Sequence, residues 1–79
     1  MNAQTDKSAA ETAIDARGLR CPLPVLRLRK VALSLPADTP LTLSADDPAA
    51  NRDVPAFCVE MGWHCETLGS GKWRIRRLG

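Results

Sequence analysis

The sequence lacks the features that mark secreted, membrane-spanning and strongly nucleic-acid-binding proteins. Residues 1–12 contain no apolar core of the kind a signal sequence has, and no stretch approaches the ~18 apolar residues of a membrane span. The three cysteines are an odd number without a C-x-x-C pair, which argues against a disulfide framework and predicts a reducing, cytoplasmic setting. A net charge of +2 is too small to indicate a general nucleic-acid binder.

The 79 residues have room for one small domain. Residues 1–11 are small and polar without a periodic apolar face, so we predict a flexible N-terminal tail followed by a domain over residues 12–79. Alternating and helical apolar spacings predict the order β-α-β-α-β-β, with a closing β-hairpin. The economical fold is a two-layer α/β (α+β) sandwich, a four-stranded mixed sheet with both helices on one face. The predicted strands are 12–16, 41–45, 63–68 and 73–78, and the helices are 22–34 and a segment after residue 48.

The second predicted helix has apolar residues at i, i+3, i+4 and i+7. We expect Pro55 near the start of its regular part, with Asp53 before it as the cap. Gly62 is expected to end this helix. The apolar residues are Val54, Phe57, Cys58 and Met61.

Cys21 stands where the first strand gives way to the first helix and is followed by Pro22 and Pro24. Proline suits the first turn of a helix, so we predict Pro22 as the first helical residue and Cys21 as its cap. A helix N-terminus with nearby Arg17 and Arg20 stabilises a thiolate against a free-thiol pKa of about 8.5. Cys21 is therefore the predicted nucleophile or persulfide carrier, and it requires no histidine base.

Two blocks of this sequence together resemble the TusA-like (SirA-like) sulfur-carrier proteins. The resemblance implies the same β-α-β-α-β-β sandwich and a cysteine, here Cys21, that accepts sulfane sulfur as a persulfide and passes it to another protein. It implies a carrier acting as a sulfurtransferase rather than a stand-alone turnover enzyme. The matching residues are Asp15 and 18–24 in the first block, then 45–48, 52–55 and 57–58 in the second.

The family resemblance also implies the partners. The donor would be a pyridoxal-phosphate cysteine desulfurase or a rhodanese-type protein, and the carrier itself would need no cofactor. The acceptor would belong to tRNA thiolation, molybdenum-cofactor sulfur supply or sulfur oxidation. Leu23 stands between the two prolines, where the members that act in tRNA thiolation carry glutamate. A carrier that offers one thiol to successive partners has no need to self-associate, so we expect a monomer.

The polar face of the first predicted helix is rich in cations. Arg27 and Lys30, together with Arg17 and Arg20, would form a basic docking rim around the sulfur. Such a rim speeds encounter with acidic partners more than it raises affinity. The alternative interpretation is an ordinary solvated helix face.

The C-terminal hairpin suggests a different function, a small nucleic-acid-binding or regulatory module in which Cys21 is incidental. Basic side chains would contact phosphates and aromatic rings would stack on bases. The competing interpretation is an edge hairpin protected by charge. The residues concerned are Lys72, Arg74, Arg76 and Arg77, with Trp63 and Trp73.

The other two cysteines are weaker candidates for chemistry. Cys58 lies on the apolar stripe of the second predicted helix, so we expect core packing, with a resolving disulfide to Cys21 as the minor alternative. Cys65 alternates with His64 on a predicted strand, which places these two side chains on opposite faces.

Two further residue groups are interpreted as structural. The cysteines and the single histidine lack the short-loop spacings of zinc sites, so no metal is predicted. Asp46 and Asp47 precede a proline, and we expect them to shape a turn and a helix start rather than act as an acid/base pair.

Overall fold

The computed structural model describes residues 12–78 and contains four strands and two helices in that range. Their order confirms the predicted β-α-β-α-β-β arrangement. The predicted tail at residues 1–11 lies outside the described residues. The elements are β1 (Thr12–Asp15), α2 (Leu23–Leu33), β2 (Pro40–Ser44), α3 (Ala50–Met61), β3 (His64–Gly69) and β4 (Lys72–Arg76).

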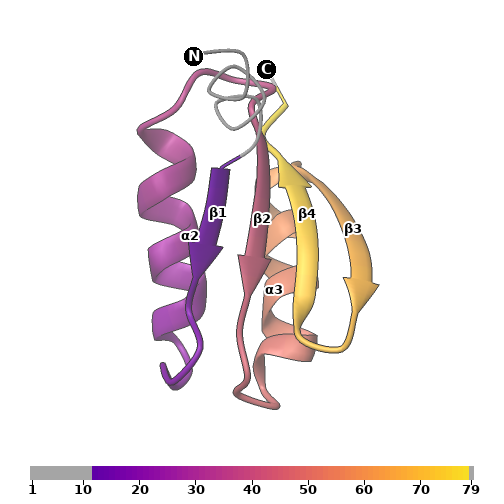
Figure 1. Ribbon diagram of the computed structural model, residues 1–79. Coiled ribbons are helices and arrows are strands. Elements are labelled where there is room, and N and C mark those ends of the chain that lie inside the picture. The colour runs from indigo at the N-terminus through magenta and orange to yellow at the C-terminus, as the bar shows by residue number, and fades with distance from the viewer. Residues whose placement is uncertain (1–11, 79) are drawn as a thin grey trace.

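The four strands form one mixed sheet in the order β1-β2-β4-β3 (Figure 1). β1 and β2 are parallel, whereas β4 is antiparallel to both β2 and β3. A parallel pair needs a long crossover connection, and α2 supplies it between β1 and β2. β3 and β4 form the predicted closing hairpin.

The core lies between the sheet and the two helices. On β2, Leu41 and Leu43 are buried while Thr42 between them is only partly so, which gives the sheet one apolar face. Leu28 of α2 and Val54 of α3 are fully buried against that face. The predicted two-layer sandwich with both helices on one face is therefore confirmed.

Both tryptophans belong to this core. Trp73 is 2% exposed and Trp63 is 7% exposed. The ring of Phe57 meets that of Trp63 edge to face, with centroids 5.3 Å apart. The two indole rings, predicted as a possible stacking platform for bases, are instead packed in the core.

The first helix begins one residue later than predicted. α2 starts at Leu23, and Pro22 is its N-cap rather than its first helical residue. The carbonyl of Arg20 accepts the Leu23 N–H at 2.8 Å in a turn, and the first helical bond runs from Leu26 N–H to the Pro22 carbonyl at 3.1 Å. Cys21 therefore lies just outside the helix instead of capping it, while Pro24 remains in the first turn.

The second helix begins earlier than predicted. α3 starts at Ala50, so Pro55 lies inside the helix and Asp53 is in its first turn rather than at its cap. The start is set by Asp47, whose Oδ1 accepts the Ala49 N–H at 3.2 Å and whose carbonyl accepts the Ala50 N–H at 2.9 Å. The expectation that Asp47 shapes a turn and a helix start is confirmed.

Both helices end with specific contacts. Gly62 ends α3 as predicted, with a φ of 74° that a residue with a Cβ adopts only at a cost. At the end of α2, the guanidinium of Arg77 donates to the Ala32 carbonyl at 3.2 Å and to the Leu35 carbonyl at 2.6 Å. Arg77 thereby ties the segment after β4 to the end of α2 and to the loop that follows it.

Candidate functional site

The site forms where two loops meet at one end of the sheet. Because β1 and β2 are parallel neighbours, the loops that leave their carboxyl ends, β1–α2 and β2–α3, lie at the same end, the lower one in Figure 1. Asp46 Oδ1 accepts the Gly18 N–H at 2.9 Å, and Asp47 Oδ2 accepts the Cys21 N–H at 2.6 Å. The second loop thereby holds the backbone of the first.

The thiol of Cys21 makes a hydrogen bond across this junction. Its Sγ donates to Oδ2 of Asp53, in the first turn of α3, at 2.9 Å. The other carboxylate oxygen of Asp53 accepts from Nε of Arg52 at 3.2 Å. Cys21 is an exposed residue, so the sulfur is both held and accessible.

The electrostatics of the thiol differ from the expectation drawn from the sequence. The hydrogen bond to Asp53 raises the pKa of Cys21 above its ordinary value, with smaller contributions from desolvation and from the charges of Asp53 and Asp47. The charge of Arg52 acts in the opposite direction. The same hydrogen bond lowers the pKa of Asp53. In this arrangement the hydrogen bond to Asp53 favours the protonated thiol of Cys21, whereas the sequence predicted a helix-stabilised thiolate.

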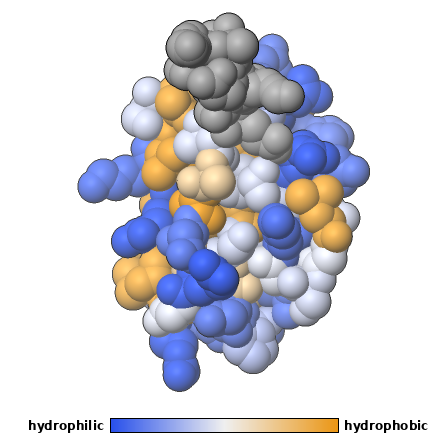
Figure 2. Space-filling model, viewed as in Figure 1, coloured by the Kyte–Doolittle hydropathy of each residue, from blue (hydrophilic) through white to orange (hydrophobic). Residues whose placement is uncertain are grey.

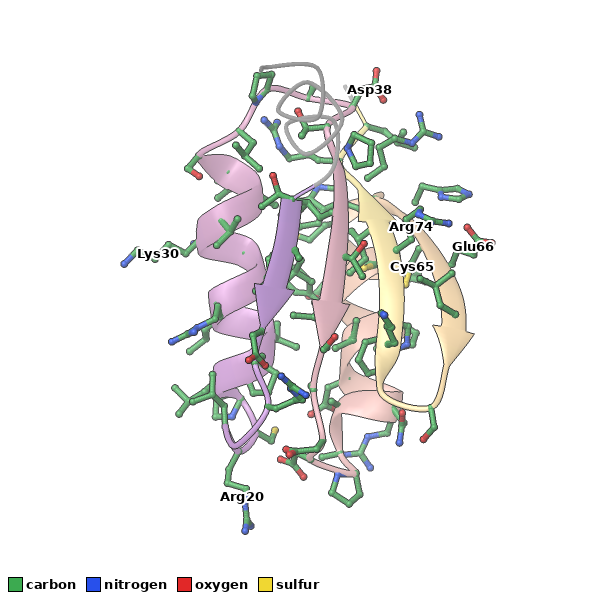
Figure 3. All side chains as sticks on the ribbon, viewed as in Figure 1. Arg20, Lys30, Asp38, Cys65, Glu66 and Arg74 are labelled. Carbon is green, nitrogen blue, oxygen red and sulfur yellow. The ribbon has the colours of Figure 1, made fainter. Side chains whose placement is uncertain are left out.

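The two arginines proposed to stabilise an anionic sulfur lie on the same loop but have other neighbours. Arg17 forms a two-point ion pair with Asp15, with Nε 2.9 Å from Oδ1 and Nη2 3.1 Å from Oδ2. Arg20 projects from the lower end of the molecule (Figure 3) and its charge lowers the pKa of Asp47. Neither arginine is among the groups that shift the pKa of Cys21.

Arg27 and Lys30 line two adjoining shallow grooves beside α2. One groove of about 270 Å³ includes Leu23 and Leu26, and the other, of about 470 Å³, runs along β1. Leu23 and Leu26 are about half exposed, at 49% and 52%. Figure 2 shows hydrophobic and hydrophilic side chains next to one another along this side of the molecule, and Lys30 points outward in Figure 3. We define the docking rim as the part of the predicted rim that lies on α2, Arg27 and Lys30, together with the neighbouring Leu23 and Leu26; Arg17 and Arg20 are not part of it.

The other two cysteines are placed as expected. Cys58 is fully buried in the core, and burial raises its pKa to about 12. Cys65 is partly buried against the core, whereas His64 beside it is exposed, so their side chains lie on opposite faces of β3. Within residues 12–78, no three or more His, Cys, Asp or Glu side chains are grouped so as to hold a metal ion.

The three arginines of the C-terminal hairpin, Arg74, Arg76 and Arg77, have structural partners. Arg74 pairs with Glu66 at 3.5 Å, two side chains that adjoin in Figure 3, and Arg76 pairs with Asp38 at 3.3 Å. Arg77 contacts the end of α2 as described above. With both tryptophans buried, the hairpin offers no aromatic platform, and the nucleic-acid interpretation loses the stacking on which it depended. Neither helix of the described residues is long and apolar enough to cross a membrane.

The roles of Asp47 and Asp53 at the thiol were not predicted from the sequence. The missed signal was topological, because two successive strand-to-helix loops on parallel neighbouring strands must meet at the same sheet edge. That rule brings Asp46 and Asp47 to the Cys21 loop. Finding Asp53 also required the correct start of α3.

An exposed cysteine beside the carboxyl ends of a parallel strand pair, on a small two-layer domain, defines a protein that presents a thiol at its surface. Residues 12–76 match the sulfurtransferase TusA family, and the chain belongs to that family. A crystal structure of a SirA-like protein from Desulfitobacterium hafniense is similar, with 28% sequence identity and a TM-score of 0.67. The match covers 82% of this chain and 92% of that one.

Proposed function

We propose that this protein is a sulfur carrier that accepts sulfane sulfur on Cys21 as a persulfide and relays it to an acceptor protein. The observation that supports it most is the exposure of Cys21 at the junction of the two loops, in a chain that belongs to the TusA family. The other two thiols are buried or partly buried. A carrier must offer its sulfur to two proteins in turn, and only Cys21 has the access for that.

The loading step is a thiol–persulfide exchange. The sulfur of Cys21 attacks the outer sulfur of a donor persulfide, so that a bond forms between Sγ and that sulfur while the donor's own sulfur–sulfur bond breaks. The electron pair leaves with the donor sulfur, which ends as a thiol carrying the proton that Cys21 gives up. One sulfur–sulfur bond replaces another, and the step needs no oxidant or reductant.

The donor in this proposal is a cysteine desulfurase or a rhodanese-type protein, and the carrier acts as a monomer in the cytoplasm. The acceptor is a downstream relay protein of tRNA thiolation, molybdenum-cofactor sulfur supply or sulfur oxidation. Direct contact with nucleic acid is not part of the proposal. Pro22 and Pro24 set the start of α2 beside Cys21, and Arg17 and Arg20 remain our candidates for stabilising the anionic sulfur once it is loaded.

The docking rim is the surface we assign to the partners. It combines half-exposed leucines, which a partner would cover, with Arg27 and Lys30, which favour an acidic surface. It also begins at Leu23, two residues from the sulfur. An acidic protein surface with an apolar centre is the complement that fits it.

The test is a sulfur-loading assay in which the added sulfur is detected by mass spectrometry. The protein is incubated with a cysteine desulfurase, its pyridoxal phosphate and free cysteine, and in parallel with a rhodanese and thiosulfate, and the intact and peptide masses are measured. We expect one added sulfur atom on the Cys21 peptide, removed by reductant and absent in Cys21→Ser. Failure to load from either donor, or loading that survives Cys21→Ser and disappears in Cys58→Ser, would contradict the proposal.

A further inference from the structure

The charged groups around the Cys21 sulfur are mostly acidic, which is unusual for a nucleophilic cysteine. The charged groups that act on Sγ are Asp53 and Arg52 of α3 and Asp47 of the β2–α3 loop. Two of the three are acidic, and Asp53 is in direct hydrogen-bond contact at 2.9 Å. Reactive cysteines ordinarily lie in electropositive surroundings, because the thiolate is the attacking species. The arrangement therefore calls for a role other than activation.

We propose that Asp53 is a positioning residue that holds unloaded Cys21 in its thiol form, directed at α3, and releases the sulfur once it is loaded. This inference rests on the proposed carrier function. The carboxylate that accepts the hydrogen bond from the thiol belongs to α3 and not to the loop that carries Cys21. Arg52 donates to the other carboxylate oxygen of Asp53, Oδ1. This contact favours the ionised form of Asp53, which can accept the hydrogen bond from the thiol.

The hydrogen bond exists only while Sγ carries its proton. In the persulfide, the outer sulfur replaces that proton on Sγ, so Asp53 can no longer accept a bond from it. An ionised outer sulfur would in addition be repelled by the carboxylates of Asp53 and Asp47. The same residue thus retains the unloaded sulfur and turns the loaded sulfur toward solvent, where an acceptor protein can reach it.

Holding the thiol form also protects an exposed cysteine. Oxidation and unspecific alkylation both proceed through the thiolate, and their rates follow its fraction and its exposure. Cys21 is exposed, so only its protonation state can limit these reactions. A donor that docks at the site would have to displace the bond to Asp53, which reserves Cys21 for its partners.

The experiment measures how fast iodoacetamide modifies Cys21 as a function of pH, with peptide mass spectrometry reading that residue alone. Asp53→Asn removes the charge and keeps the shape, so we expect the midpoint of its rate profile at lower pH and severalfold faster modification at pH 7. Asp53→Glu keeps a carboxylate and should keep its midpoint above that of Asp53→Asn. Asp46→Asn is the matched control, because Asp46 holds the Gly18 amide of the same loop rather than the thiol.

An unchanged or raised midpoint in Asp53→Asn would overturn the inference, as would a midpoint in Asp53→Glu as low as that in Asp53→Asn. Near-ultraviolet circular dichroism from the two buried tryptophans checks that each variant is folded, and Asp53→Ser is a second neutral variant if Asp53→Asn is not. No sulfur donor takes part in this measurement. Failure here with normal loading would reject only the role of Asp53, whereas the expected shift without loading would reject the carrier function and the release step that depends on it, and would leave the hold of Asp53 on the thiol.

Discussion

Cys21 and Cys58 are two thiols of one small domain whose pKa values are both raised, for different physical reasons. At Cys21 the main cause is a hydrogen bond to Asp53 at an exposed position. At Cys58 it is burial, which raises the pKa to about 12. A docking partner can displace a hydrogen bond at the surface, whereas only unfolding can return Cys58 to water. In our proposal the thiol of Cys21 reacts only when a partner docks, whereas that of Cys58 is shielded by the core as long as the protein is folded.

Their surroundings differ in the same way. The loop of Cys21 is held by side chains of another loop, through the bonds from Gly18 to Asp46 and from Cys21 to Asp47. Cys58 lies on the buried face of α3 and is held by apolar packing in the core, with Cys65 as a partly buried neighbour. A partner protein can replace the few hydrogen bonds of the Cys21 loop with hydrogen bonds of its own. It cannot replace the close packing around Cys58.

The largest effect that tests this comparison is on stability. Cys58→Ser should reduce the free energy of unfolding by about 1–3 kcal/mol, because it buries a hydroxyl group in an apolar core. In Cys21→Ser the hydroxyl can still donate to Asp53 at the surface, so we expect almost no change. Urea unfolding followed by tryptophan fluorescence measures both variants.

The comparison would be wrong if the two serine variants were equally stable, or if Cys21→Ser were the less stable one. Cys65→Ser is the intermediate case, because Cys65 is only partly buried. Its loss of stability should fall between the other two.

The fold could be predicted because each strand and helix has an apolar face that shows as a local pattern in the sequence. The alternation of Leu41 and Leu43 with hydroxyl residues, and the helical spacing of Val54 and Cys58, reflect packing against one core and can be recognised locally. The burial of Cys58 and the helix end at Gly62 follow from the same patterns. These features depend only on neighbours within about two turns of helix or one strand.

The details of the site could not be predicted in the same way. Asp53 and Cys21 are 32 residues apart, and their contact depends on where α3 begins. With Pro55 at the helix start, Asp53 would have capped its own helix. Because Asp47 starts the helix at Ala50, Asp53 is placed in the first turn, where it accepts from the thiol. The earlier start of α3 thus reversed the expected direction of the shift in the Cys21 pKa.

The second test of the comparison concerns access to the surface thiol. Arg27→Glu combined with Lys30→Glu should slow sulfur loading severalfold at low ionic strength, with a smaller effect as salt is added, because steering by surface charge is screened. Loading kinetics are measured by quenched mass spectrometry at several salt concentrations.

The matched control uses two adjacent cations of α2. Lys30→Glu and Arg29→Glu change the net charge equally, but only Lys30 lines the grooves of the docking rim. Equal rates for these two single variants would show that the rim is an ordinary solvated helix face, and unchanged rates in the double variant would remove it as a docking surface.

The smallest expected effect is a local response to acid that separates the two regions. The pKa of Asp15 is lowered to about 2 by its bonds to Arg17, and that of Asp47 is lowered by the amides of Cys21 and Ala49. A carboxyl whose pKa is lower in the folded protein stabilises it above its unfolded pKa, about 3.9 for aspartate, and that stabilisation is lost as the pH falls through the folded value. The Cys21 loop should therefore loosen between about pH 4 and about pH 2.

Proton NMR can follow this response amide by amide. The Cys21 amide signal reports on Asp47 and the Arg17 amide on Asp15, whereas the Trp63 amide, bonded to the Cys58 carbonyl at 2.8 Å, reports on the core. We expect the first two signals to shift with midpoints below 3.9 while the Trp63 signal stays in place. Midpoints at or above that value, or simultaneous movement of all three signals, would mean that these carboxylates do not hold the loop. The exposed thiol and the buried one would then depend on the same cooperative structure.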